Sequence, residues 1–442
     1  MVVVLSKRWQ GSRVYSTGRQ SPPFMLRTLS LTALSLAITS GPLRAERELW
    51  QDFTKAPHDY WTRPVTDRFS LLKEDLASGK IALDRSSEKA FVMDLLEVLK
   101  VPASSQMLLF SATSLQLSLI STRNPRALYF TDDLYVGWMP GGKVEIVSLD
   151  PVLGGIYYIF EVPRSSSNGT LRVERSNRCM NCHGAADSGW VPGLVLSSVI
   201  PGPNGGSLIG YRQEMLGHGV PLSERMGGWL VTGTGNWRGH RGNQTGTLYA
   251  GKLTTSPLPF GQTFDVNRYP AATSDLLPHL LHEHQAGFIT VALEAGYRAR
   301  AALHDGGGLV PAGREAELDK AAEALVRYLL FTDEVKLPPG GVTGEETFRK
   351  DFAATGVPDA AGRSLRDLEL NTHLLKHRCS YMIYSPVFTG LVPEMKTRVL
   401  RRLETALRTG VRDELSRSMT GAEKEAIRGI LNATLPDWKS SE

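Results

Sequence analysis

A tight cluster of metal-binding and nucleophilic side chains stands out in this sequence at Cys179-Met180-Asn181-Cys182-His183. Two of the three cysteines of the chain lie here, separated by two residues, and a histidine follows directly. C-x-x-C-H is the attachment pattern of c-type haem, in which both thiols form thioether bonds to the porphyrin vinyl groups. The adjoining histidine is placed under the ring, where it binds the iron axially. The spacing therefore predicts one covalent haem c on Cys179 and Cys182, with His183 as the proximal ligand.

Three other chemistries use two cysteines at this spacing and stay open as alternatives. A thioredoxin-like C-x-x-C requires a strand before it and a helix after it, whereas Arg178 precedes this motif and a glycine-containing segment, 184–189, follows it. A structural zinc site needs two further ligands, and the only other cysteine is Cys379, which we expect to be a small buried hydrophobic residue. A disulfide would leave His183 without a role. We therefore favour haem.

Through Cys179, Cys182 and His183 the chain resembles c-type cytochromes. That resemblance implies a redox role, with the two cysteines as attachment points and the histidine as proximal ligand. The motif lies deep in the chain instead of near the start of a compact domain, so the small three-helix cytochrome fold is not expected. More loosely, several segments look like those of large exported bacterial proteins that carry one such motif. These segments are 221–229, 240–243, 274–275 with 283–285, and 379–381.

The sixth iron ligand decides what a bound haem does. A protein side chain in that position limits the iron to electron transfer, whereas an open position admits peroxide, oxygen or other small molecules. The leading candidate is His240, which lies in a glycine-rich stretch whose backbone can approach a flat ring. His218 is in a similar stretch, and both stretches are expected to be solvated loops. The lesser candidates are Met215, Met226 and His284.

A second group of histidines lies on a predicted helix. His279, His282 and Glu283 are three and four residues apart, so they share one helix face. Metal sites in helix bundles use such faces but need a second Glu-x-x-His segment, which the sequence lacks. We expect a surface helix with a solvated polar stripe instead.

The periodicity of apolar residues changes along the chain. Helical spacing runs through 46–100, and β-branched and aromatic runs between turns then predict strands at 128–130, 135–138, 155–160, 194–200, 207–211 and 228–232. After about residue 270 amphipathic helices return, at 315–331, 365–376, 393–408 and 420–431. The prediction is an α+β fold with a helical N-terminal segment (46–105), a β-rich haem-bearing domain (106–268) and an α-helical C-terminal domain (269–442).

The charge of the chain is concentrated at its start. The net charge is +5 over 442 residues, but residues 1–45 hold six basic and no acidic side chains. The remainder has 44 Lys and Arg against 45 Asp and Glu, a net charge of −1, so no nucleic-acid partner is expected. Residues 29–38 form a short apolar run after a cationic stretch, which is typical of a signal peptide. Translation then starts at Met1 or Met25, and the mature chain is expected to be exported to the periplasm or cell envelope without a transmembrane segment.

These inferences converge on an exported c-type cytochrome that holds one covalent haem and exchanges electrons with a redox partner protein. The leading alternative is a haem-dependent oxidoreductase of peroxidase type with an open distal side, because the chain is much longer than an electron carrier requires. A haem-based sensor or a binding module is a third class. The sequence leaves undecided whether the protein is an enzyme.

Overall fold

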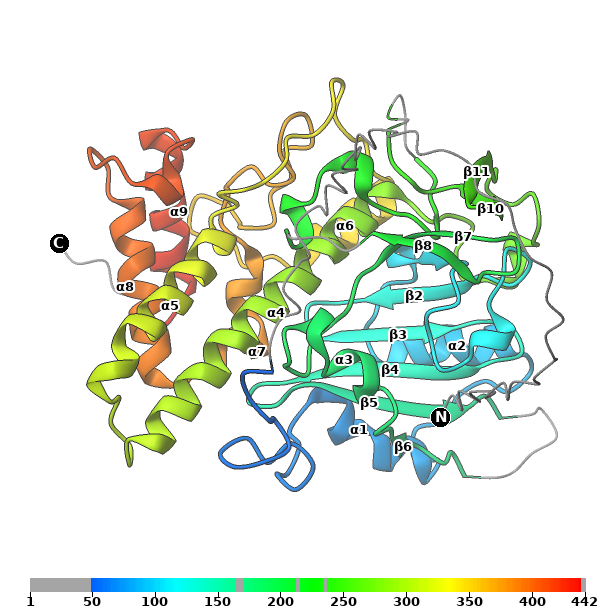
Figure 1. Cartoon of the computed structure of the whole chain (residues 1–442), viewed down its shortest axis with the longest axis horizontal. Helices are drawn as coiled ribbons and strands as arrows, with labels where there is room; N and C mark the ends of the chain where they lie inside the picture. The colour runs from blue at the N-terminus through cyan, green and yellow to red at the C-terminus, as the bar shows by residue number, and fades with distance from the viewer. Residues whose placement is uncertain (1–48, 164–169, 212–214, 234–236, 238, 439–442) are drawn as a thin grey trace, which may run out of the picture. The chain divides into compact units, whose positions relative to one another are not determined.

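The structure, a computed structural model, describes residues 49–163, 170–211, 215–233, 237 and 239–438 (Figure 1). Helices combine with antiparallel sheets over this part of the chain, which confirms the predicted α+β class. The described residues belong to one contact unit, and the division at residues 105 and 268 stays a prediction. The predicted leader, 1–45, lies outside the described residues.

A seven-stranded sheet, in the order β6-β5-β4-β3-β2-β1-β9, positions the haem-type motif, and every neighbouring pair of strands is antiparallel. Its strands are β1 (Met107–Leu109), β2 (Arg126–Phe130), β3 (Leu134–Trp138), β4 (Lys143–Asp150), β5 (Gly154–Glu161), β6 (Glu174–Arg175) and β9 (Trp229–Leu230). Short turns join β2 through β5 into a meander. The predicted strands at 128–130, 135–138 and 155–160 are confirmed, and β4 completes the meander between the last two.

The two faces of this sheet bury different residues. In β4, Val144 and Ile146 point to one face, and Glu145 and Val147 point to the other, because successive strand residues alternate. The first face is covered by α1 (Arg68–Ala77) and α2 (Glu88–Val98), whose buried phenylalanines join the same apolar cluster as Val144 and Ile146. The N-terminus of each helix is capped by a side chain. Asp67 accepts a hydrogen bond from the amide of Ser70, and Ser87 accepts one from the amide of Ala90. Elsewhere in the predicted N-terminal helical segment, the described residues from 49 onward form turns and loops, with one 3-10 turn at Ala103–Ser105.

A 30-residue helix, α4 (Leu276–Asp305), packs on part of the second face. Figure 1 shows α4 running from the sheet to the C-terminal helices at the left. Its neighbours there are α5 (Glu315–Leu329), α7 (Pro386–Thr389) and α8 (Pro393–Leu407), and α9 (Gly421–Thr434) packs on α8. α6 (Glu346–Ala354) contributes Phe348 and Phe352 to the same apolar cluster as α4. The predicted helices at 315–331, 393–408 and 420–431 are thereby confirmed.

The predicted helix at 365–376 is wrong. This segment forms a tight loop closed by a bridge between Leu368 and Leu375. The Glu369 carboxylate accepts the backbone amides of Asn371, Thr372 and His373, and these bonds hold the chain in a turn. Local side-chain bonding to the backbone overrides the helical spacing of the apolar residues here.

Two small hairpins complete the β structure, β7 (Ser198–Pro201) with β8 (Ser207–Tyr211), and β10 (Gln244–Tyr249) with β11 (Lys252–Pro257). The predicted strand at 207–211 is confirmed as β8. Those at 194–200 and 228–232 are shorter in the structure, as β7 and β9.

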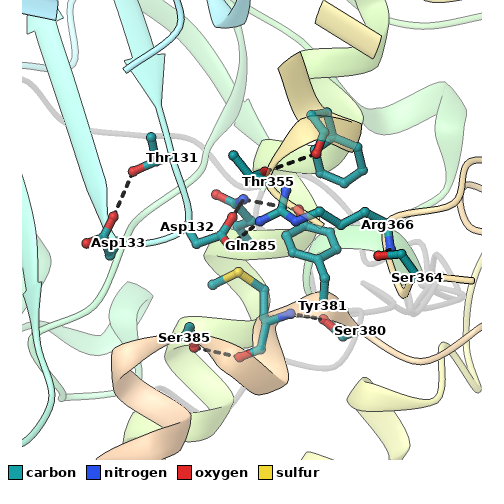
Figure 2. A network of polar contacts seen from close by, with 12 residues as sticks. Thr131, Asp132, Asp133, Gln285, Thr355, Ser364, Arg366, Ser380, Tyr381 and Ser385 are labelled. Atoms are coloured by element: carbon teal, nitrogen blue, oxygen red, sulfur yellow. Dashed lines mark hydrogen bonds and ion pairs between the residues drawn. The ribbon is translucent and has the colours of Figure 1, made fainter. Parts of the chain in front are cut away.

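A buried polar network joins the sheet to the C-terminal part. In Figure 2, Arg366 and Gln285 converge on Asp132, which lies in the turn between β2 and β3. Gln285, on α4, also donates to the Tyr381 hydroxyl at 3.0 Å and accepts from the Tyr135 hydroxyl at 2.9 Å. Three parts of the chain that are distant in sequence therefore meet in one set of hydrogen bonds.

Candidate functional site

The Cys179–His183 motif folds as a single helical turn directly after β6. Cys179 is the N-terminal cap of α3 (Met180–His183), and its carbonyl accepts the amides of Cys182 and His183 at 3.2 and 3.1 Å. Residues three and four apart on a helix lie on one side, so this turn gathers the two thiols and the imidazole together. Both thiols are free, with Cys179 half-buried and Cys182 exposed.

The imidazole of His183 is oriented by a backbone carbonyl. Its Nδ1 lies 3.0 Å from the oxygen of Gly193, and the hydroxyl of Tyr157 donates to the same oxygen at 2.5 Å. The Tyr157 and His183 rings are 4.6 Å apart between centroids. A carbonyl accepts only, so Nδ1 must carry the proton, and the lone pair is left on Nε2. Among the described residues none is hydrogen-bonded to Nε2.

This arrangement fits an axial iron ligand. Metal-binding histidines commonly donate their other ring N–H to a carbonyl, which fixes the tautomer and the ring orientation. Burial lowers the pKa of His183 to about 4 against the raising effect of the Gly193 hydrogen bond, so the ring is neutral at pH 7. Burial also favours the neutral form of the Cys179 thiol. It raises the pKa of that thiol, although a hydrogen bond with Ser176 opposes the shift. The residues present therefore fit a covalent haem that Cys179 and Cys182 would attach and that His183 would ligate.

The loop after the motif is held in place by residues from the start of the described chain. Trp50 donates to the carbonyl of Gly189, and Gln51 donates to that of Trp190, both at 2.9 Å. Phe53 packs on Gly184, where an added Cβ would come within 2.7 Å of the phenylalanine ring. Gly184 is thus required for the close approach between the turn and the N-terminal segment.

The sheet contributes a charged pair close to the motif. Arg126 on β2 and Glu145 on β4 form an ion pair across β3, and both side chains are largely buried. The Arg126 side chain reaches Glu145 by crossing over Gly137 of β3. A glycine is needed there, because a Cβ would collide with the Arg126 guanidinium. Arg126 acts electrostatically to lower the pKa of His183, and Glu145 acts to raise it. Sequence reasoning did not find Arg126, Glu145, Tyr157 or Gly193, because only strand register and loop folding bring them to the motif.

His240 lies near β9, the edge strand on the opposite side of the seven-stranded sheet from β6. Its Nδ1 accepts the amide of Gly242 at 3.0 Å, and its ring contacts Trp237. The neighbouring Asn243 donates its amide to the Trp229 carbonyl on β9, whereas His183 contacts Tyr157 on β5. Five strand spacings separate β9 from β5, or roughly 24 Å between backbones. The described contacts do not join His240 to His183, and its role as distal ligand stays a prediction.

The other axial candidates are engaged elsewhere. His218 and His284 contact each other through their Nδ1 atoms at 2.7 Å, and His284 Nε2 lies 2.7 Å from the Ser380 hydroxyl. Both histidines are buried against Phe331, so the expectation of a solvated loop around His218 is wrong. His240 is also buried. Met226 is in the core and Met215 is 41% exposed.

The predicted solvated stripe on α4 is also wrong. His279 and His282 are buried because this part of α4 faces the sheet instead of solvent. His282 contacts the Phe130 and Tyr135 rings, and His279 Nε2 lies 3.1 Å from the Ser274 hydroxyl. Glu283, the third member of the stripe, pairs with Arg225 at 3.3 Å, and burial raises its pKa to about 7 against the influence of that arginine.

Cys379 lies in the apolar core shared by α4 and the C-terminal helices, as predicted for a small buried hydrophobic residue. Burial raises the pKa of its thiol to about 12. No group of three or more His, Cys, Asp or Glu side chains is arranged to hold a metal ion in the part of the chain that the structure describes.

Comparisons with protein-family models, with curated proteins and with solved structures gave no match to this chain. Within the described ranges, none of the helices has both the length and the apolar content needed to cross a bilayer.

Proposed function

We propose that this chain is an exported c-type cytochrome of the periplasm or cell envelope that carries one covalent haem and transfers electrons. Cys179 and Cys182 would hold the porphyrin through thioether bonds, and His183 would be the proximal ligand. The observation that carries the proposal is the hydrogen bond between His183 Nδ1 and the Gly193 carbonyl, on the same helical turn as two free thiols. It leaves Nε2 with the lone pair that an axial ligand needs.

When bound, haem supplies a one-electron couple between ferric and ferrous iron. The protein's part is to fix the imidazole and to set the local charge. Tyr157 and Gly193 hold the ring, and the Arg126–Glu145 pair places one positive and one negative charge close to it. Because Phe53 of the N-terminal segment packs closely on Gly184, small movements of the turn are resisted.

A haem-dependent oxidoreductase with an open distal side is the second candidate function. It is favoured by the pairing of His218 with His284, since recruiting either to the iron would break a buried 2.7 Å contact. Carbon monoxide separates the two functions. An unchanged spectrum of the reduced protein indicates two firmly bound protein ligands and electron transfer, whereas a shifted spectrum indicates an accessible sixth position.

The attachment itself is tested by expression in a host with cytochrome c maturation. We expect the haem of the wild type to stay with the protein through acidic organic extraction, and that of a Cys179→Ala/Cys182→Ala variant to be extracted. Cys379→Ala is the matched control, since it removes the third thiol, and its haem is expected to stay bound. Haem that resists extraction from the double variant, or a wild type without haem, would contradict the proposal.

A further inference from the structure

The edge of the sheet next to the motif carries a concentration of arginines. β6 is the edge strand, and only three residues separate it from Cys179. Arg172, Arg175 and Arg178 lie within seven residues that contain one acidic side chain, Glu174. This segment has a net charge of +2, on a chain whose residues after 45 sum to −1.

These charges are not neutralised by ion pairs. Arg172 and Arg178 are exposed, and neither forms a salt bridge with a described carboxylate. Arg175 uses its Nη2 to donate to the Tyr60 carbonyl at 2.7 Å, which leaves its charge uncompensated. Uncompensated guanidinium groups produce a local positive potential that attracts anionic partners over distances of about a Debye length, roughly 8 Å at physiological salt.

An exposed tryptophan lies beside Arg175. Trp61 is 37% exposed, and the Arg175 guanidinium lies over its ring at 5.2 Å and over the Tyr60 ring at 4.8 Å. Tyr60 is buried and anchored by a 2.6 Å hydrogen bond from its hydroxyl to the Gly155 carbonyl. A rigid aromatic group supported by arginine is the composition typical of binding hot spots between proteins.

Packed rings lead from this surface to the motif. Trp61 meets Tyr60 edge-on at 4.8 Å between centroids, and Tyr60 meets Phe53 edge-on at 5.5 Å. Phe53 in turn packs on Gly184, the residue that follows His183. The surface therefore has a continuous van der Waals connection to the residues that would hold the haem.

We propose that Trp61, Arg172, Arg175 and Arg178 form a docking surface for an acidic electron-transfer protein. This inference rests on the proposed function. The charge of the surface selects a partner with a carboxylate-rich face, and Trp61 supplies an apolar contact beside Arg175. The step performed there is a one-electron exchange in which the partner is oxidised and the haem iron is reduced from ferric to ferrous, with no bond formed or broken.

The test uses the haem-loaded protein and an acidic flavodoxin as the probe. Calorimetry with oxidised flavodoxin at low salt measures docking without electron transfer. We expect Arg172→Glu/Arg178→Glu to weaken binding about tenfold or more, and Trp61→Ala to weaken it severalfold. Raising the salt concentration should weaken wild-type binding and affect the charge-reversed variant much less. Arg401→Glu/Arg412→Glu, on exposed positions in and after α8, is the matched control with the same change in charge, and its binding should stay close to that of the wild type.

Reduction by the small anion Fe(EDTA)²⁻ provides a second readout that needs no protein docking. Its rate at low salt should fall in the charge-reversed variant and stay unchanged in Trp61→Ala. Haem content and the far-ultraviolet circular dichroism spectrum establish that each variant is loaded and folded. A loaded Arg172→Glu/Arg178→Glu variant that matches the wild type in both readouts would overturn the docking surface alone. A wild type that acquires no haem would overturn the proposed function and this inference together.

Discussion

The Nδ1 atom of His183 and the hydroxyl of Tyr157 converge on one acceptor, the carbonyl oxygen of Gly193. Tyr157 belongs to β5, and Gly193 closes the loop that follows the motif. Gly155, also on β5, donates its amide to the carbonyl of Pro192 at 2.8 Å. The orientation of the proposed iron ligand is therefore set by the central sheet, through two hydrogen bonds to adjacent residues of the loop.

Removal of the Tyr157 hydroxyl should change the electronic character of the ligand. In Tyr157→Phe, the Gly193 oxygen accepts from Nδ1 alone, so the N–H···O bond strengthens and the imidazole becomes a stronger electron donor. A stronger donor stabilises ferric iron. We expect the midpoint potential of the loaded protein to fall by tens of millivolts, on a scale where about 59 mV is a tenfold change in the equilibrium.

Spectroelectrochemical titration measures this shift. Tyr158→Phe is the matched control, because the neighbouring tyrosine points to the opposite face and donates to Asp67 at 2.7 Å. Its potential should equal that of the wild type. Equal potentials for Tyr157→Phe and the wild type would show that Tyr157 does not influence the ligand.

Gly184→Ala should loosen the turn that carries the motif. The added Cβ would lie 2.7 Å from the Phe53 ring, so the ring or the turn must move. Overpacking of this kind costs roughly 1–3 kcal/mol. Urea unfolding should show a loss of that size, whereas Gly313→Ala, where an added Cβ meets no atom within 4 Å, should change stability by less than about 0.5 kcal/mol. Equal stabilities for the two variants would contradict the packing role of Gly184.

Local patterns in the sequence predicted the elements that depend on local interactions. The apolar and aromatic runs of β2, β3 and β5, and the amphipathic spacing of α5, α8 and α9, are reproduced in the structure. The segment 365–376 has the same spacing as a helix but bends around the Glu369 carboxylate. A single side chain that accepts three backbone amides leaves no trace in apolar periodicity.

The residues of the candidate site also fall into those that a local pattern predicts and those that only the folded chain brings together. Cys179, Cys182 and His183 are close in sequence, and their spacing alone indicates the chemistry. Tyr157 and Arg126 reach the motif through the register of the sheet, which no local pattern specifies. The burial of His282 had a local signal that was outweighed by its polar neighbours, since α4 is apolar around most of its circumference and such helices are usually buried.

The network in Figure 2 should make a large contribution to stability through Arg366. Burial raises the pKa of Asp132, and Arg366 is the main influence that opposes this shift. In Arg366→Met the Asp132 carboxylate, whose side chain is 26% exposed, loses its ion pair in a partly buried position, at a cost of up to about 3 kcal/mol. Urea unfolding at pH 7 measures the loss.

A second substitution separates the ion pair from the packing of Arg366 between Phe352 and Tyr381. Asp132→Asn/Arg366→Met removes the unpaired charge and should recover a large part of the lost stability. If the double variant were no more stable than Arg366→Met, the loss would belong to packing on the two rings and not to the unpaired Asp132 carboxylate.

The buried histidines of α4 should make the protein sensitive to acid. Burial lowers the pKa of His282 from 6.5 to about 4. Between these values the unfolded chain binds a proton that the folded chain does not, so the stabilising contribution is complete above pH 6.5 and is lost as the pH falls toward 4. From pH 7.5 to 5.0 this loss amounts to about 2 kcal/mol for His282 alone. His279 and His284, whose pKa values burial lowers to about 3, act in the same direction, and Glu283, with its pKa raised to about 7, acts in the opposite one.

His282→Phe isolates one of these contributions, because the new ring can pack against Phe130 and Tyr135 but binds no proton. Urea unfolding at pH 7.5 and 5.0 gives the change in stability for each protein. We expect the change in His282→Phe to be smaller than in the wild type by about 2 kcal/mol, whatever the effect on stability at pH 7.5. His304→Gln, at the exposed end of α4, should show the same change as the wild type. A wild-type response in His282→Phe would mean that His282 titrates in the folded protein as it does in the unfolded chain, so that its burial between α4 and the sheet carries no electrostatic cost.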